Sequence, residues 1–224
     1  MGTVTLSKQN RLFWLGRYTE RVYTTIQFLS ELYDQIIDGT EVDYPAICRR
    51  LGIPCPYTGS EDFFRRYLFD RTDPGSVISG VDSMLGNGMV LRETISTPTL
   101  AYLQMASSAM ELAEKSDSPR LELQWVQDDI MAFRGSFDDS VDTETARNIT
   151  KCGSSVERIS LMLRLGTAED AVLRRELQKL LNRLYKTDLT ANQDALEVVT
   201  QKALDGAEVD PARLLSSVEG LFPV

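Results

Sequence analysis

One long amphipathic stripe limits what this chain can fold into. Between Ser7 and Asp38, apolar or small residues recur at alternating steps of four and three, which places them on one side of an α-helix. The stripe consists of Leu15, Thr19, Val22, Ile26, Leu29, Tyr33 and Ile36. Gly39 follows directly and is suited to cap the end of this helix. Because a helix of about thirty residues must bury its stripe against other helices, the pattern favours a helical bundle.

The remainder of the chain repeats helical patterns separated by glycine and proline. Helices are predicted over residues 44–51, 61–69, 76–95, 97–115, 119–133, 143–165, 168–185, 190–205 and 211–220. Gly135 is expected to end the helix that begins at Pro119. Gly86 and Gly88 are expected to need either a kink or the close approach of a neighbour or ligand. The fold class predicted is all-α, as one domain over 1–224 whose segment 167–224 is a helical tail packed on the bundle.

Composition excludes several classes of function. The 224 residues contain no histidine, which excludes Ser-His-Asp and Cys-His triads, histidine zinc sites and the Glu-x-x-His di-iron motif. The 24 basic and 33 acidic residues give a net charge of −9, which argues against nucleic acid or an anionic membrane as a partner. Three cysteines are too few for a disulfide framework, so a cytoplasmic location is expected. No metal site and no cofactor of its own is predicted.

Two distant segments share a motif. Residues 15–22 read LGRYTERV and residues 152–159 read CGSSVERI. Glycine, glutamate and arginine match at a constant offset of 137 residues, and the flanking apolar positions match too. The repeat predicts two pseudo-symmetric helices, near residues 7–38 and 143–165.

The charged residues of the motif allow two interpretations. Arg17 and Glu20 are three residues apart, so they could form an ordinary ion pair on a solvated helix face. Alternatively, both Glu-Arg pairs face a second helix layer or a polar cleft and form a network across the two helices. In that case Gly16 and Gly153 would let a neighbouring backbone approach beside each pair.

With these motifs the chain resembles the Alpha-E family of bacterial helical proteins, named for its Glu-Arg motif. Residues 15–21 match the family's first motif fully, and Glu157-Arg158 match the second, in which Ser154 and Ser155 replace arginine and tyrosine. The resemblance covers about residues 7–166. Its other matching positions are Phe69-Asp70-Arg71, Asn87, Arg92-Glu93, Gly135-Ser136 and Asp138.

The resemblance implies a function by association. Alpha-E proteins accompany, or are fused to, a circularly permuted ATP-grasp protein in systems that look like ATP-dependent amide or peptide ligation. This chain has no glycine-rich loop that could cradle a phosphate, so the nucleotide site is expected in the partner. The prediction is therefore an accessory helical protein, more a non-catalytic partner of the ligase than an enzyme, which holds a substrate or the ligase through its Glu-Arg pairs.

The binding residues that this hypothesis names are charged or amide-bearing side chains. Arginine forks bind carboxylates and glutamates bind amines, so together they suit an amino acid or a peptide end. The candidates are Arg17, Glu20, Arg21, Glu157, Arg158, Asp70, Arg71, Asn87, Arg92 and Glu93. One alternative is a structural, protein-binding bundle with the pairs as internal cross-braces. Another is an enzyme with Glu20 or Glu157 as general base. The oligomeric state stays open.

Two further features have structural interpretations. Trp14 and Trp125 are expected to anchor the core, because large aromatic side chains bury the most apolar surface. The run Arg174-Arg175-Glu176 is expected to be an exposed helix face.

Overall fold

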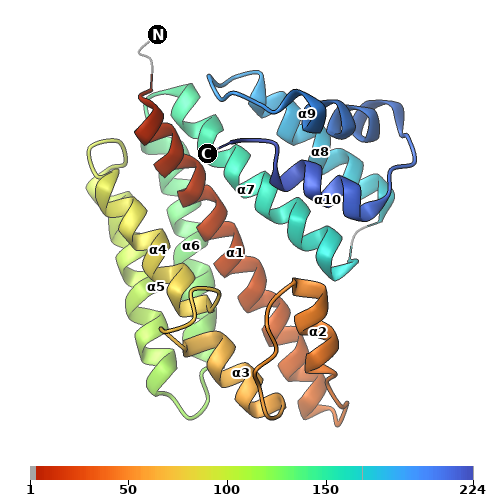
Figure 1. The fold of residues 1–224 in the computed structure, drawn as a ribbon. Helices are drawn as coiled ribbons and strands as arrows, with labels where there is room; N and C mark the ends of the chain where they lie inside the picture. Colours follow the sequence, from red (N-terminus) through yellow and green to blue (C-terminus); the bar gives the residue numbers. More distant parts are fainter. Residues whose placement is uncertain (1–3, 168, 224) are drawn as a thin grey trace. The chain divides into compact units, whose positions relative to one another are not determined.

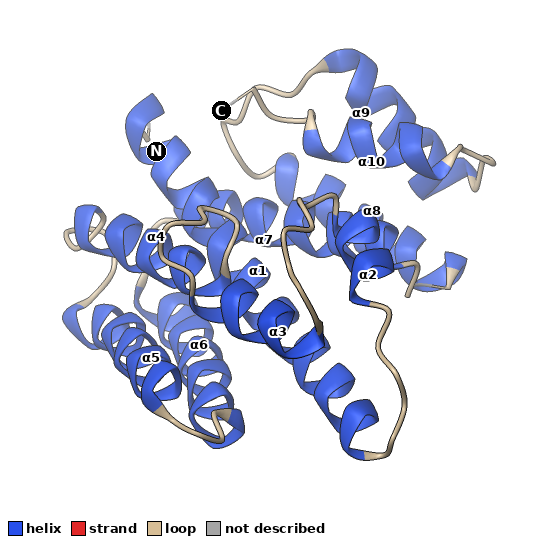
Figure 2. Ribbon diagram, turned by 60° about the horizontal axis from the view of Figure 1, so that its bottom comes forward, coloured by secondary structure: helices blue, strands red, loops and turns tan. Residues whose placement is uncertain are grey.

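The computed structural model describes residues 4–167 and 169–223, and within these residues every regular element is a helix and none is a strand (Figures 1 and 2). The elements are α1 (Leu6–Ile37), α2 (Tyr44–Leu51), α3 (Ser60–Phe69), α4 (Val77–Val90), α5 (Thr97–Lys115), α6 (Arg120–Ser140), α7 (Glu144–Leu165), α8 (Asp170–Leu184), α9 (Gln193–Thr200), a π-helical turn (Gln201–Asp205) and α10 (Pro211–Glu219). The all-α prediction is confirmed. Within the described ranges, no helix combines the length and apolarity needed to cross a membrane.

The chain forms two compact units. Unit 1 comprises residues 1–20 and 142–224, and unit 2 comprises residues 21–141. The boundary falls inside α1, so the first half of this helix belongs to unit 1 and the second half to unit 2.

In unit 1, α8 and α10 both pack on α7, and α9 packs on α10. The first half of α1 contributes Phe13, which is buried and makes an edge-to-face ring contact with Phe222 at 5.3 Å. The helix α7 ends at Leu165, as predicted, and Gly166 caps it in the left-handed conformation with φ of 64°.

In unit 2, α5 and α6 form a hairpin of neighbouring helices, and α4 packs against α5 (Figures 1 and 2). Gly88 of α4 has the closely approaching neighbour that the sequence led us to expect. A Cβ added to it would lie 2.5 Å from Cδ1 of Leu103, so the glycine permits the close approach of α5. The helix α4 ends at Val90, earlier than predicted, and turns connect it to Ile95.

The prediction that Gly135 ends a helix is wrong, because α6 continues to Ser140. Phe137 beyond the glycine is buried, and the hydroxyls of Ser136 and Ser140 lie 2.6 Å and 2.9 Å from Oγ1 of Thr99 on α5. These tertiary contacts hold the last turns of α6 in helical form and outweigh the low helix propensity of one glycine.

The two tryptophans, Trp14 and Trp125, differ in their surroundings and exposure. Trp14 is half-buried, and the guanidinium of Arg17 lies over its ring at 5.0 Å. Trp125 is 43 % exposed, so the prediction that it anchors the core is wrong. The inward side of α6 is formed instead by Leu123, Val126 and Ile130.

Candidate functional site

The two motif helices touch through their backbones, at the glycines. A Cβ on Gly16 would lie 1.9 Å from the carbonyl oxygen of Thr150, and a Cβ on Gly153 would lie 2.0 Å from that of Phe13. No side chain fits at either position, since real Cβ contacts are essentially never shorter than 3.0 Å. The sequence prediction of a close approach at both glycines is confirmed.

The contact has local two-fold pseudo-symmetry. With the sequence offset of 137, Gly16 corresponds to Gly153 and Phe13 corresponds to Thr150. The contact of Gly16 with Thr150 and the contact of Gly153 with Phe13 are therefore equivalent under exchange of the two helices. The hydroxyl of Ser154 adds a hydrogen bond to the carbonyl oxygen of Gly16 at 3.1 Å. The repeat seen in the sequence therefore corresponds to two helices that cross at equivalent points.

The charged residues pair across this crossing. Nε of Arg17 donates to Oε2 of Glu157 at 2.7 Å. Arg158 binds Glu20 with two parallel hydrogen bonds, from Nε to Oε1 at 2.7 Å and from Nη2 to Oε2 at 2.9 Å. Arg17 is thus paired with the other helix and not with Glu20 three residues along its own helix, so the solvated i, i+3 pair is not what forms.

Both glutamates are buried. The side chain of Glu20 is 2 % exposed and that of Glu157 is 5 % exposed. Burial also disfavours the charge of Arg158, but its hydrogen bonds to Glu20 and the charges of Glu20 and Glu176 outweigh this and raise the pKa of the guanidinium above its ordinary value. A buried carboxylate without a partner is costly by several kcal/mol, so these guanidinium contacts are needed to keep the glutamates inside.

A third helix extends the network. Glu176 of α8 is buried, accepts from Nη1 of Arg158 at 3.4 Å, and accepts from Nζ of Lys179 at 2.7 Å. The prediction of an exposed face at this residue is wrong. The spacing in the sequence indicates that Glu176 is buried. It follows Leu173 by three positions and precedes Leu180 by four, which places it on the apolar side of α8.

The stabilisation from Glu176 is expected to depend on pH. Burial raises the pKa of this carboxyl, but the hydrogen bond from Lys179 and the charges of Arg158 and Lys179 outweigh it, so the pKa lies below the ordinary 4.5. Because the unfolded chain then binds this proton more tightly, the stabilisation is complete above about pH 5 and is lost as the pH falls through 4.5 and below. Urea unfolding should show Glu176→Gln less stable than the wild type by about 1 kcal/mol at pH 7. The difference should shrink towards pH 3, and a constant difference would contradict this.

The two serines that depart from the family pattern have their own partners. Besides its bond to Gly16, Ser154 donates to the carbonyl oxygen of Thr150 at 3.3 Å. Ser155 is buried and accepts a short hydrogen bond from Arg183 of α8. In place of a second arginine and tyrosine, this copy of the motif therefore ties α7 to α1 and to α8.

Of the remaining candidates, three lie near the start of unit 2 or in its turns. Arg21 is half-buried, and its positive charge partly offsets the rise in the pKa of Tyr67 that burial causes. Asp70 ends α3 and accepts from the backbone and hydroxyl of Thr72, which lowers its pKa. Arg71 is exposed and forms ion pairs with Asp82 at 2.7 Å and Glu114 at 3.5 Å.

The other three candidates are also in unit 2. Asn87 is buried within α4. Arg92 and Glu93 lie in the turns after α4, where they pair with each other at 3.3 Å and are 70 % and 88 % exposed. Asp70, Arg71, Arg92 and Glu93 thus bind residues of unit 2. The network of Arg17, Glu20, Glu157, Arg158 and Glu176 belongs to unit 1.

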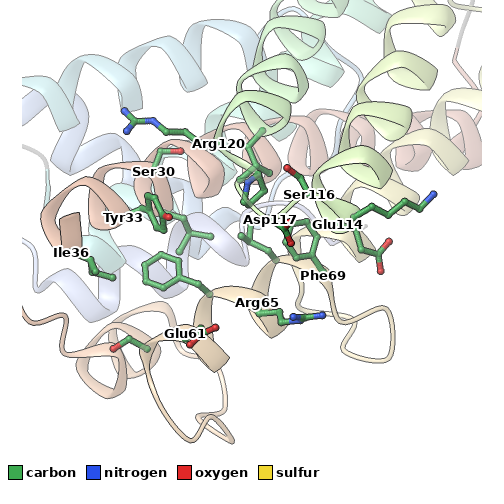
Figure 3. Close-up of a pocket in the computed structure, with 17 residues that line it drawn as sticks. Ser30, Tyr33, Ile36, Glu61, Arg65, Phe69, Glu114, Ser116, Asp117 and Arg120 are labelled. Atoms are coloured by element: carbon green, nitrogen blue, oxygen red, sulfur yellow. The ribbon is translucent and has the colours of Figure 1, made fainter.

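A pocket of about 640 Å³ lies within unit 2, and no sequence motif predicted it (Figure 3). The second half of α1, the helix α3 and the turn between α5 and α6 surround it. Tyr33, Phe64 and Phe69 supply aromatic surface, and Arg65 and Arg120 are among its charged residues. None of the lining residues belongs to the Glu-Arg motif.

Comparison with known proteins gives one match. The model of the Alpha-E family, described as a predicted alpha-helical domain with a conserved ER motif, matches residues 8–203. No curated protein and no solved structure matches the chain. The matched range extends beyond residue 166 and includes α8 with Glu176. The chain therefore belongs to the Alpha-E family.

Proposed function

We propose that this protein is an accessory, non-catalytic binding partner in an ATP-grasp-linked amide or peptide ligation system, and that its Glu-Arg pairs are internal braces. One observation carries the second part: each motif glutamate is buried and bound by an arginine of the other helix. A brace of this kind fixes the relative position of two helices, which a binding partner needs if its surface is to match another protein.

The geometry favours a brace over a group that works on a substrate. A general base must lie within hydrogen-bond reach of the proton that it removes. Glu20 is 2 % exposed, and both of its oxygens accept from Arg158. Nε and Nη2 of Arg158 both donate to Glu20. These two groups are therefore not available to bind the carboxylate of an amino acid or peptide.

The ATP-grasp partner is proposed from the family resemblance. In such systems the nucleotide and the acyl transfer would belong to the partner, since this sequence has no phosphate-binding glycine loop. Unit 1 would then present a surface whose shape depends on the crossing of α1 and α7.

The test is a binding measurement on the full chain with the ATP-grasp protein from the same genome. We expect the two to co-purify, and ATP turnover by the ligase to change on addition of this protein. Glu20→Gln should lower thermal stability and leave the affinity per folded molecule within about twofold. Unchanged stability with abolished turnover would favour the substrate-holding alternative, and no complex with any ATP-grasp protein of that cell would contradict the proposal.

A further inference from the structure

A second surface of unit 2 is an open groove between α5 and α6, of about 520 Å³. We call it the α5–α6 groove. It is lined by Ala101, Gln104, Met105, Ser108, Ala109 and Leu112 of α5 and by Trp125, Asp128 and Asp129 of α6. On each helix these positions follow steps of three and four, so they form one continuous stripe per helix.

Large apolar side chains are exposed in this groove. Met105 is 51 % exposed, Leu112 is 52 % exposed and Trp125 is 43 % exposed. Leu121, one turn before Trp125 on the same stripe, is 59 % exposed. Single exposed apolar residues are ordinary, but a group of this kind around a tryptophan is typical of a protein-binding surface.

The shape of the groove suits a helix. Small residues, Ala101, Ser108 and Ala109, alternate with the larger Met105 and Leu112 along α5. Ridges of another helix can fit between such large side chains. The α5 stripe covers twelve positions, which corresponds to about 17 Å, or roughly three turns of an opposing helix.

The charge of the groove specifies the partner further. Asp128 accepts a hydrogen bond from Gln124 at 2.8 Å, and within residues 4–167 and 169–223 neither Asp128 nor Asp129 has a cationic partner. Burial and the charge of Asp128 raise the pKa of Asp129 above 3.8. The segment 97–140 that carries the groove holds eight acidic and three basic residues. A lysine or arginine placed here would relieve this uncompensated negative charge.

We infer that the α5–α6 groove is the docking site for an amphipathic helix of a partner protein, with apolar side chains against Trp125, Met105 and Leu112 and a lysine or arginine against Asp128 and Asp129. The inference rests on the proposed function in one respect, namely that this protein works by binding another protein. Apolar burial supplies the affinity, and the carboxylates select a basic partner helix over an acidic one.

The test uses the full chain carrying Trp14→Phe, which leaves Trp125 as its single tryptophan. The probe is a 15-residue peptide with leucines at i, i+3, i+4 and i+7 and lysines beside them. A second peptide has glutamates in place of the lysines, and a third has the leucines shuffled. We expect a blue shift of Trp125 emission with the lysine peptide alone.

Matched variants then locate the contact. Affinity for a labelled lysine peptide should fall about tenfold or more in Trp125→Ala and several-fold in Asp128→Asn with Asp129→Asn. The pair Asp188→Asn with Glu208→Gln removes the same charge from exposed positions of unit 1 and should change affinity less than twofold.

Three results would overturn the inference. These are no binding up to about 1 mM, an equal loss from both charge-removing pairs, or a blue shift on raising the protein concentration alone, which would mean that a second copy covers the groove. The proposed function fails separately. If the lysine peptide does not bind while the wild-type chain still forms a complex with the ATP-grasp protein, only the groove is wrong, whereas a wild-type chain that forms no such complex contradicts the proposed function.

Discussion

Replacing Gly16 or Gly153 by alanine is expected to lower the free energy of unfolding by about 2–4 kcal/mol. The added Cβ would meet a backbone carbonyl oxygen, that of Thr150 or of Phe13, at about half of a normal contact distance. A backbone oxygen cannot rotate away as a side chain can, so the helices must move apart and the contacts beside the crossing weaken. The gain in helix propensity from alanine, about 1 kcal/mol, offsets only part of this loss.

The same chain supplies matched controls for this experiment. Gly86 and Gly135 also lie inside helices, but nothing lies within 4 Å of a Cβ added to either. Alanine there should raise stability by up to about 1 kcal/mol. Urea unfolding of the four variants distinguishes the cases. Equal effects at all four positions would mean that α1 and α7 do not touch through their glycines.

Replacing Glu20 by leucine is the second change with a large expected effect, a loss of about 2–4 kcal/mol. The substitution leaves Arg158 half-buried without the carboxylate that accepts two of its hydrogen bonds. The loss should stay below that of a fully buried pair, because Arg158 is 36 % exposed and keeps its contact with Glu176. Thermal and urea unfolding measure the change.

A control and a compensating variant accompany it. Glu111→Leu changes an exposed glutamate near the C-terminal end of α5 and should alter stability by no more than about 0.5 kcal/mol. Glu20→Leu combined with Arg158→Leu should be less destabilising than Glu20→Leu alone, because no buried charge then lacks a partner. A double variant with the full summed loss would contradict the ion pair as the source of the effect.

The sequence predicted the helices well where periodicity and caps agree. The stripe of α1, the cap at Gly39 and the end of α7 at Leu165 needed only local information. Gly135 misled the prediction because the contacts that keep α6 helical, those of Ser136 and Ser140 with Thr99, come from a residue on a different helix. Propensity alone does not contain such tertiary contacts.

The candidate site was predicted in outline and not in its pairings. The offset between the two motifs indicated which helices meet, and the glycines indicated a close approach. Which arginine binds which glutamate depends on how the helices cross, so Arg17 could be assigned to Glu20 or to Glu157 equally well. The part played by Glu176 was missed because a charged residue on an apolar face was interpreted by its charge and not by its position.

The central claim is that Glu20 and Arg158 form a brace between two helices, and a double-mutant cycle on this pair tests it most directly. Glu20→Gln, Arg158→Gln and the double variant are compared with the wild type by urea unfolding at pH 7. We predict a coupling energy of about 1.5 kcal/mol or more, as contact within a shared network requires. A coupling energy near zero, with the two single losses simply adding, would contradict the account.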